Sequence, residues 1–295
     1  MEQKSFQPIL CAVLGNVIWG FGFLFTKMAL KVVNAPELML AHRFLLAAVC
    51  MTIMLLAGKK KISFKGKDLK TAGLLILAQL SYYIFESYGI LHTNATISGL
   101  VLAVAPVLTV VTGALLLKEY PTKRQALFCI MPVAGVVIMT VSGKSLGVVT
   151  PLGVLFLGLT LLASVSYKTI NRKASREFDT FERTYMVVIC PAVMLSLIAL
   201  GKVNWSFQEF VAPLSNPGYM LPVLSLGILS SIGANLLVNY ATARMSVFKV
   251  ASFGSISTLC SAFAGVVFLK EPVSIPLVVG AVLILIGVRQ VSRPK

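Results

Sequence analysis

Charged side chains are scarce in this sequence. Only 12% of its 295 residues are charged, about half of the roughly 25% that is usual in soluble domains. By contrast, 57% of the residues are hydrophobic and the mean hydropathy is +0.90. These residues fall in blocks of about 20, the length that crosses a bilayer as a helix. The composition excludes a soluble fold and predicts an all-α integral membrane protein.

Histidine and acidic residues are also few, and no two cysteines have the spacing of a metal-binding or redox pair. The chain has two histidines, and its five cysteines lie inside apolar blocks without a CxxC pair. No metal, redox centre or other cofactor is therefore expected, and the cysteines are interpreted as small hydrophobic residues. No His/Asp/Glu or Ser/His/Asp cluster is present near one membrane face, so we do not expect an enzyme. The chain also lacks a nucleotide-binding loop, which excludes ATP-driven transport by this chain alone.

The net charge is strongly positive, at +16. The basic residues lie in short connections between apolar blocks, with no nucleic-acid-binding motif around them. Cytoplasmic loops and anionic lipid headgroups explain this excess better than nucleic acid does. Membrane lipid is therefore an expected partner, and nucleic acid is not.

Ten apolar blocks are long enough to span a membrane. Eighteen of the 26 Lys and Arg fall in connections on the N-terminal side of the membrane, and four fall on the opposite side. Positive charge marks the cytoplasmic side, so both termini are predicted to be cytoplasmic in a multi-pass protein of the plasma (inner) membrane. The predicted spans are 8–30, 36–57, 71–91, 96–117, 124–142, 152–171, 184–200, 220–243, 247–269 and 274–291.

Two similar segments 152 residues apart indicate an internal repeat. The fourth span ends in Gly113-Ala-Leu-Leu-Leu-Lys-Glu119, and the ninth ends in Gly265-Val-Val-Phe-Leu-Lys-Glu271. We therefore expect two five-span halves, residues 1–146 and 147–295. Because five is odd, the halves must cross the membrane in opposite senses. Inverted repeats of this kind are typical of secondary transporters, with the substrate site near the midplane where the repeats meet.

Several motifs follow one another in a recognisable order. They are Trp19-Gly20 with Lys27, Arg43-Phe44, the run Tyr88-Gly-Ile-Leu-His-Thr-Asn-Ala-Thr through Pro106-Val107 to Leu117-Lys-Glu119, and its echo from Tyr240-Ala241 to Leu269-Lys-Glu271-Pro272. In order, spacing and duplication over the whole chain, the sequence resembles the drug/metabolite transporter superfamily, as an EamA-type ten-helix transporter. The resemblance implies ten transmembrane helices, arranged as two inverted five-helix repeats around a central cavity.

The same resemblance implies solute transport but no particular solute. Relatives include exporters of amino acids and related metabolites, importers of choline and riboflavin, and antiporters of nucleotide sugars or triose phosphates. This sequence departs from the family pattern in its second half, where Ser166-Tyr167 replaces a Trp-Ala-type start and Thr258 stands where the first repeat has Pro106. A symmetric substrate site is therefore not expected.

A polar stripe on the third span is the leading candidate for a solute site. Of the ten acidic residues, Glu86 alone lies well inside a span, and Gln79, Tyr82 and Tyr83 share its side of the helix. Desolvation would favour the protonated form of Glu86, which would suit it to carry a proton or to meet a cationic substrate. The alternative is a structural ion pair with Arg43 or Lys27, and a pair that breaks during transport would satisfy both interpretations.

Other polar and aromatic residues inside the spans have two interpretations each. Arg43 would bind a substrate carboxylate. Alternatively, it would extend its guanidinium toward the membrane surface or form a structural ion pair. The small polar residues would bind solute or join helices, and the aromatic pair Trp19 and Phe23 would line a cavity or pack. His42 is interpreted as a hydrogen-bonded interfacial histidine. The predicted substrate-binding residues are Trp19, Phe23, Arg43, Gln79, Tyr82, Tyr83, Glu86, Asn235, Asn239 and Ser255.

These features together predict a secondary transporter. It would move a small polar or amphipathic metabolite, such as an amino acid or a related compound, by alternating access, with export as one direction. The alternatives on the same fold are a flippase for lipids or lipid-linked substrates, and a nucleotide-sugar-type antiporter. The expected partners are a small-molecule solute and membrane lipid, and the chain would act as a monomer or a homodimer.

Overall fold

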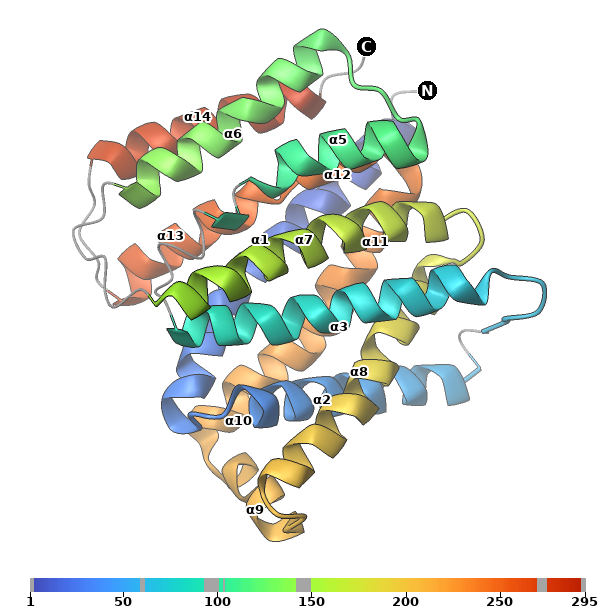
Figure 1. Ribbon diagram of the computed structural model, residues 1–295, viewed down its shortest axis with the longest axis vertical. Coiled ribbons are helices and arrows are strands. Elements are labelled where there is room, and N and C mark those ends of the chain that lie inside the picture. The colour runs from blue at the N-terminus through green and yellow to red at the C-terminus, as the bar shows by residue number, and fades with distance from the viewer. Residues whose placement is uncertain are drawn as a thin grey trace.

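The computed structural model consists of helices and short connections in the residues that it describes, which are 3–58, 62–92, 101–102, 104–141, 150–269 and 275–292. No strand occurs within these ranges. Most of the long helices run roughly along a common direction. The first described helix begins, and the last one ends, at the same end of the bundle (Figure 1). We call this the terminal end, and the other the distal end.

The helices follow the apolar blocks of the sequence. Those before residue 142 are α1 (Gln3–Val32), α2 (Pro36–Leu56), α3 (Leu69–His92), α5 (Ala105–Leu117) and α6 (Lys123–Val141). Those after residue 150 are α7 (Pro151–Ala174), α8 (Thr180–Lys202), α9 (Phe207–Val211), η1 (Ala212–Ser215), α10 (Pro217–Leu224), η2 (Ser225–Ala234), α11 (Asn235–Arg244), α12 (Val247–Phe253), α13 (Ser255–Leu269) and α14 (Ile275–Ser292).

Apolar length places these helices in a membrane. Within the described residues, five helical stretches are long and apolar enough to cross a bilayer, and they are Phe6–Val32, Pro36–Leu56, Pro151–Ala174, Thr180–Lys202 and Pro217–Arg244. Several shorter helices, such as Ala105–Leu117, are equally apolar in character. The predicted third span, α3, does not reach that level of apolarity because its polar stripe lies inside the helix.

Two predicted spans are subdivided in the structure. The span predicted at 220–243 consists of α10, the π-helical segment η2 and α11, and the span predicted at 247–269 divides at Gly254 into α12 and α13. Pro222 precedes η2, and two glycines lie inside it. These residues weaken the regular α-helical hydrogen-bond ladder, so a wider turn competes there. π-helical turns are rare in proteins, and many of those that occur inside α-helices lie at functional sites.

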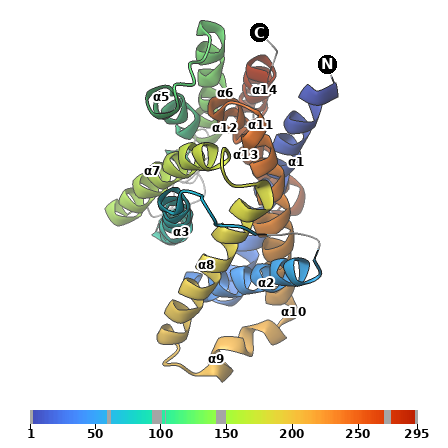
Figure 2. The same cartoon turned by 90° about the vertical axis from the view of Figure 1, so that its right-hand side faces the viewer.

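The chain pairs early helices with late ones. The most extensive contacts join α6 with α14, α3 with α7, α2 with α8 and α1 with α13. The view turned by 90° shows the same neighbours, with α6 beside α14 and α2 beside α8 (Figure 2). A large apolar cluster around Met39, Phe44 and Leu226 joins α2 to η2 and the neighbouring helices. The interior of the bundle is thus built from both parts of the chain.

Gly227 allows η2 to approach α2 closely. A Cβ atom at this position would lie 2.9 Å from the backbone oxygen of Arg43 and 3.3 Å from Cβ of Leu46. Since a backbone oxygen cannot move aside cheaply, a side chain here must push the two helices apart.

We expect Gly227→Ala to destabilise the protein by about 1–3 kcal/mol, because it overpacks the contact between α2 and η2. The measurement is thermal unfolding of the purified protein in detergent. Gly158→Ala is the matched control, since a Cβ there meets nothing within 4 Å and alanine favours the helix. Equal melting temperatures for the two variants would contradict the close packing described here.

Candidate functional site

The guanidinium of Arg43 lies buried in the interior, where α2 meets η2. Its Nε donates a hydrogen bond of 2.7 Å to Oγ of Ser231, and its Nη2 donates one of 3.0 Å to Oγ of Ser230. The guanidinium carbon also lies 4.9 Å from the centre of the Tyr83 ring, in cation–π range. Among the described residues, no carboxylate forms an ion pair with Arg43. Its partners are therefore neutral hydroxyls and an aromatic face.

The polar stripe of α3 lies next to this arginine. The hydroxyl of Tyr82 donates a hydrogen bond of 2.5 Å to Oε1 of Glu86. The Tyr83 ring packs edge-on against Tyr82, at 5.3 Å, and against Phe44 of α2, at 5.0 Å. The described residues show no ion pair between Arg43 and Glu86. Arg43 bonds the two serines of η2, and Glu86 bonds Tyr82.

Asn235 adds an unfilled acceptor at the end of η2. Its Nδ2 donates to the backbone oxygen of Ser231, at 3.1 Å. Exchanging the amide atoms would place Oδ1 against that carbonyl oxygen, so the orientation of the amide is fixed by this bond. Its Oδ1 is buried and has no hydrogen-bond partner in the described part of the chain. Buried acceptors without a partner are rare, so this oxygen is available to a donor from outside the protein.

Comparison with known proteins identifies the family. The family model described as the EamA-like transporter family matches residues 7–141 and again residues 151–293. The chain belongs to this family. It is 33% identical over 292 residues to a protein of Bacillus subtilis (strain 168) named uncharacterized transporter YcxC, covering 98% of this chain and 93% of that protein.

Two further likenesses agree. A protein of Archaeoglobus fulgidus named uncharacterized transporter is 22% identical over 278 residues, covering 94% of this chain and 95% of that protein. A solved crystal structure has a TM-score of 0.78 at 19% identity, and covers 96% of this chain and 95% of its own. At that identity, the last likeness shows the fold alone. This EamA-like chain is a multi-pass membrane transporter, as the sequence motifs indicated.

A second buried polar group in this EamA-like chain contains Asn239, and the side-chain amide of Asn239 is hydrogen-bonded within the protein. The amide of Asn239 accepts from Asn171 at 2.7 Å and donates to Thr184 at 2.8 Å. The fully buried Arg183 donates to Oδ1 of Asn171 at 2.6 Å and to the backbone oxygen of Asn239 at 2.7 Å. These bonds join α7, α8 and α11. The structure therefore places Asn239 in an internal network and not beside Arg43.

The other predicted residues are dispersed. Trp19 packs on an apolar cluster that includes Val238 and Phe253, and Ser255 lies buried at the first position of α13. Gln79 is buried on α3, about one turn before Tyr82 and Tyr83. The side chains of Phe23 and Lys27 lie outside the described part of the structure.

His42 is fully partnered, as expected of an interfacial histidine. Its Nε2 lies 2.8 Å from the backbone oxygen of Phe210, and its Nδ1 lies 2.8 Å from the hydroxyl of Tyr219. A carbonyl oxygen only accepts, so Nε2 carries a proton and donates it to Phe210. These two bonds tie α2 to α9 and α10 at the distal end.

Sequence reasoning missed a contact at the terminal end, which we call the Glu119 latch. Oε1 of Glu119 accepts from Nε of Arg172 at 2.6 Å, and Oε2 accepts from the backbone nitrogen of Val247 at 2.8 Å. Arg172 in turn donates to the backbone oxygens of Thr242 and Ala243. The latch thus joins the end of α5 to α7, α11 and α12. Glu119 belongs to the Leu-Lys-Glu motif that marked the repeat in the sequence. Its partners Arg172 and Val247 are distant in the chain, so the sequence alone did not indicate them.

We expect Ser231→Ala to destabilise the protein by about 1–3 kcal/mol, because the Nε proton of the buried Arg43 loses its acceptor. The measurement is chemical or thermal unfolding in detergent. Ser225→Ala is the matched control in the same π-helical segment. Within the described residues, the Ser225 hydroxyl bonds the oxygen of Leu221, one turn earlier in α10, and does not support Arg43. Equal stability of the two variants would show that the serine does not support the guanidinium.

Proposed function

We propose that this EamA-like protein is a secondary transporter that moves a small zwitterionic or amphipathic metabolite, of the amino-acid class, by alternating access. The observation that carries the proposal is the buried Arg43 guanidinium, which is held by two serine hydroxyls instead of a carboxylate. A charge inside a membrane is costly and is retained where it has a function. Hydroxyls are weaker partners than an anion, so a substrate carboxylate can replace them as a two-point partner of the guanidinium.

The neighbouring groups complement a zwitterion. Tyr83 links Arg43 to the rest of the stripe, because its ring packs against both Arg43 and Tyr82. Tyr82 in turn bonds Glu86, whose carboxylate would offer oxygen acceptors to a substrate ammonium group. The Oδ1 of Asn235 offers one more acceptor that the protein leaves unfilled. The rings of Tyr82 and Tyr83 supply an aromatic wall for an apolar side chain. Carboxylate, ammonium and side chain would each have a partner within one group of residues.

The proposed site would lie between two inverted halves, residues 1–146 and 147–295. The twofold match of the family model supports this division, as does the pairing of early with late helices. Arg43 would come from the first half, and Ser230 and Ser231 from the second. A substrate site where inverted repeats meet is the usual arrangement in secondary transporters with such repeats. The complete bundle would have ten transmembrane helices.

Alternating access requires contacts that open and close at the two ends. The Glu119 latch is suited to this role, because it joins the end of α5 with α7 and α12 across the proposed boundary between halves. We infer that the latch holds the terminal end shut in this conformation. The terminal end would face the cytoplasm of a plasma (inner) membrane, since Lys65, Lys67 and most of the other basic residues lie in the connections on that side.

The test is counterflow of labelled amino acids in proteoliposomes that contain the purified protein. We expect saturable exchange by the wild type, and at least tenfold less exchange by Arg43→Gln and by Glu86→Gln. Arg43→Lys keeps the charge but loses the planar fork, so its KM should rise more than its maximal rate falls.

Ser225→Ala is the control for protein quality, and should exchange at the wild-type rate. Exchange that is indifferent to both Arg43→Gln and Glu86→Gln would remove the proposed site. Scrambling of labelled lipid by the wild type without amino-acid exchange would replace the proposal with a flippase.

A further inference from the structure

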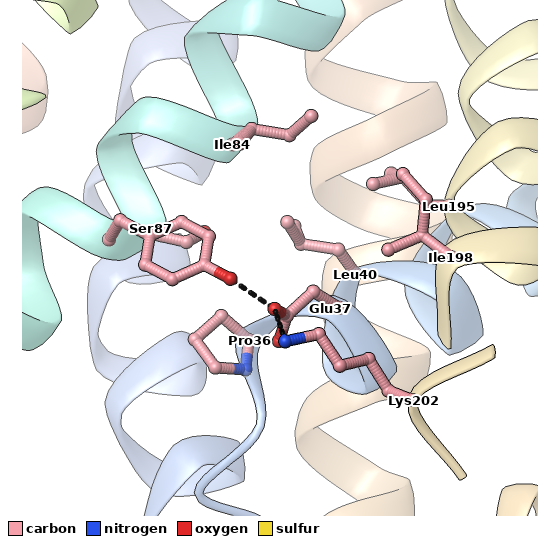
Figure 3. A pocket seen from close by; sticks show the side chains of 9 residues that line it. Pro36, Glu37, Leu40, Ile84, Ser87, Leu195, Ile198 and Lys202 are labelled. Carbon is pink, nitrogen blue, oxygen red and sulfur yellow. Dashed lines mark hydrogen bonds and ion pairs between the residues drawn. The ribbon is translucent and has the colours of Figure 1, made fainter. Parts of the chain in front are cut away.

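A cavity of about 150 Å³ opens at the distal end, between α2, α3 and α8. None of its lining residues belongs to the group around Arg43. Figure 3 shows the side chains of Glu37 and Lys202 meeting at one side of the cavity, with Ile84, Leu40 and Leu195 around the remainder. The lining residues are Pro36, Glu37, Leu40, Ile84, Ser87, Tyr88, Leu195, Ile198 and Lys202.

Glu37 is the anionic group of this cavity. Its side chain is 15% exposed, and its Oε1 accepts a hydrogen bond from the hydroxyl of Tyr88. Lys202 approaches the same oxygen, with Nζ at 3.7 Å, but its side chain is 67% exposed. An ion pair between a long, exposed lysine and a carboxylate at this distance contributes little stability. Lys202 can therefore swing into water at small cost.

The residues that line the cavity indicate which kind of ligand would replace Lys202 beside Glu37. Most of the lining is hydrocarbon, from Leu40, Ile84, Leu195 and Ile198. The position of Glu37 in the first turn of α2 suits the helix dipole, but the dipole does not account for an apolar cavity beside the carboxylate. A cavity of this volume holds a body the size of benzene. A ligand with one cationic group and one compact apolar body matches both features.

We propose that this cavity is a peripheral binding site for a small organic ammonium ion, with Glu37 as its counter-ion and Lys202 as the partner that it displaces. The ammonium group bonds the Glu37 carboxylate, and the hydrocarbon body fills the space between α2, α3 and α8. The site is separate from the one proposed around Arg43, so it does not depend on which solute that site carries.

The test is calorimetric titration of the full chain in detergent with benzylamine as the probe. We expect saturable binding to the wild type and at least tenfold weaker binding to Glu37→Gln, which keeps the shape but loses the charge. Lys202→Ala should bind several-fold more tightly because the competing ammonium group is gone. Lys31→Ala removes a charge from the same end outside the cavity, and its affinity should equal that of the wild type.

Several results would overturn the proposal. Unchanged affinity in Glu37→Gln would do so, as would weaker binding by Lys202→Ala or equally tight binding of benzyl alcohol, the neutral counterpart. Ile84→Trp fills the cavity without touching the carboxylate and should also abolish binding, so the proposal stays testable if Glu37→Gln does not fold.

The natural ammonium ion has two sources, a soluble amine or a lipid headgroup. Repeating the titration in nanodiscs with and without phosphatidylethanolamine separates them. Apparent affinity that falls as this lipid is added assigns the site to the headgroup, and constant affinity assigns it to a soluble amine.

Discussion

The interior of this protein is governed by one constraint, which is that polar groups in hydrocarbon must find partners within the protein or in a bound solute. Two buried arginines meet it differently. Arg183 is surrounded by carbonyl oxygens and the amide of Asn171, so its requirement is met internally. Arg43 has two serine hydroxyls and an aromatic ring. The first arrangement fixes helices in place, whereas the second leaves a charge that an anion would satisfy better.

The backbone around Arg43 is adapted to this role. The π-helical segment η2 carries both serines and is followed by Asn235, whose Oδ1 has no partner in the described residues. Gly227 within the segment lets the helix approach the backbone of α2. The close approach of η2 to α2 brings the hydroxyls of Ser230 and Ser231 to Arg43. The acceptor oxygen of Asn235 follows directly after this irregular segment. Irregular helices inside a membrane are expected where they line a cavity or a solute path.

Much of the fold could be predicted because apolar length alone determines where helices can span. The stripe of Tyr82, Tyr83 and Glu86 could also be predicted, since helical spacing puts these residues on one side and a lone acidic residue stands out in an apolar span. Ser230 could not, because nothing in the sequence distinguishes it from the other serines of the spans. The network of Asn239 could not be predicted for a related reason, since its partners Asn171 and Thr184 belong to other helices. The register of η2 depends on the packing of α2, which local sequence does not encode.

A solute path that opens to each side in turn would expose the group around Arg43 first to one side of the membrane and then to the other. The direct measurement places a single cysteine at Gln79, in a variant without the five native cysteines that still exchanges solute, and labels it with a membrane-impermeant thiol reagent from either side. If Arg43 lies on such a path, we expect labelling from both sides, and slower labelling when transported solute is present. Labelling from neither side, or from one side only whatever solute is added, would contradict it.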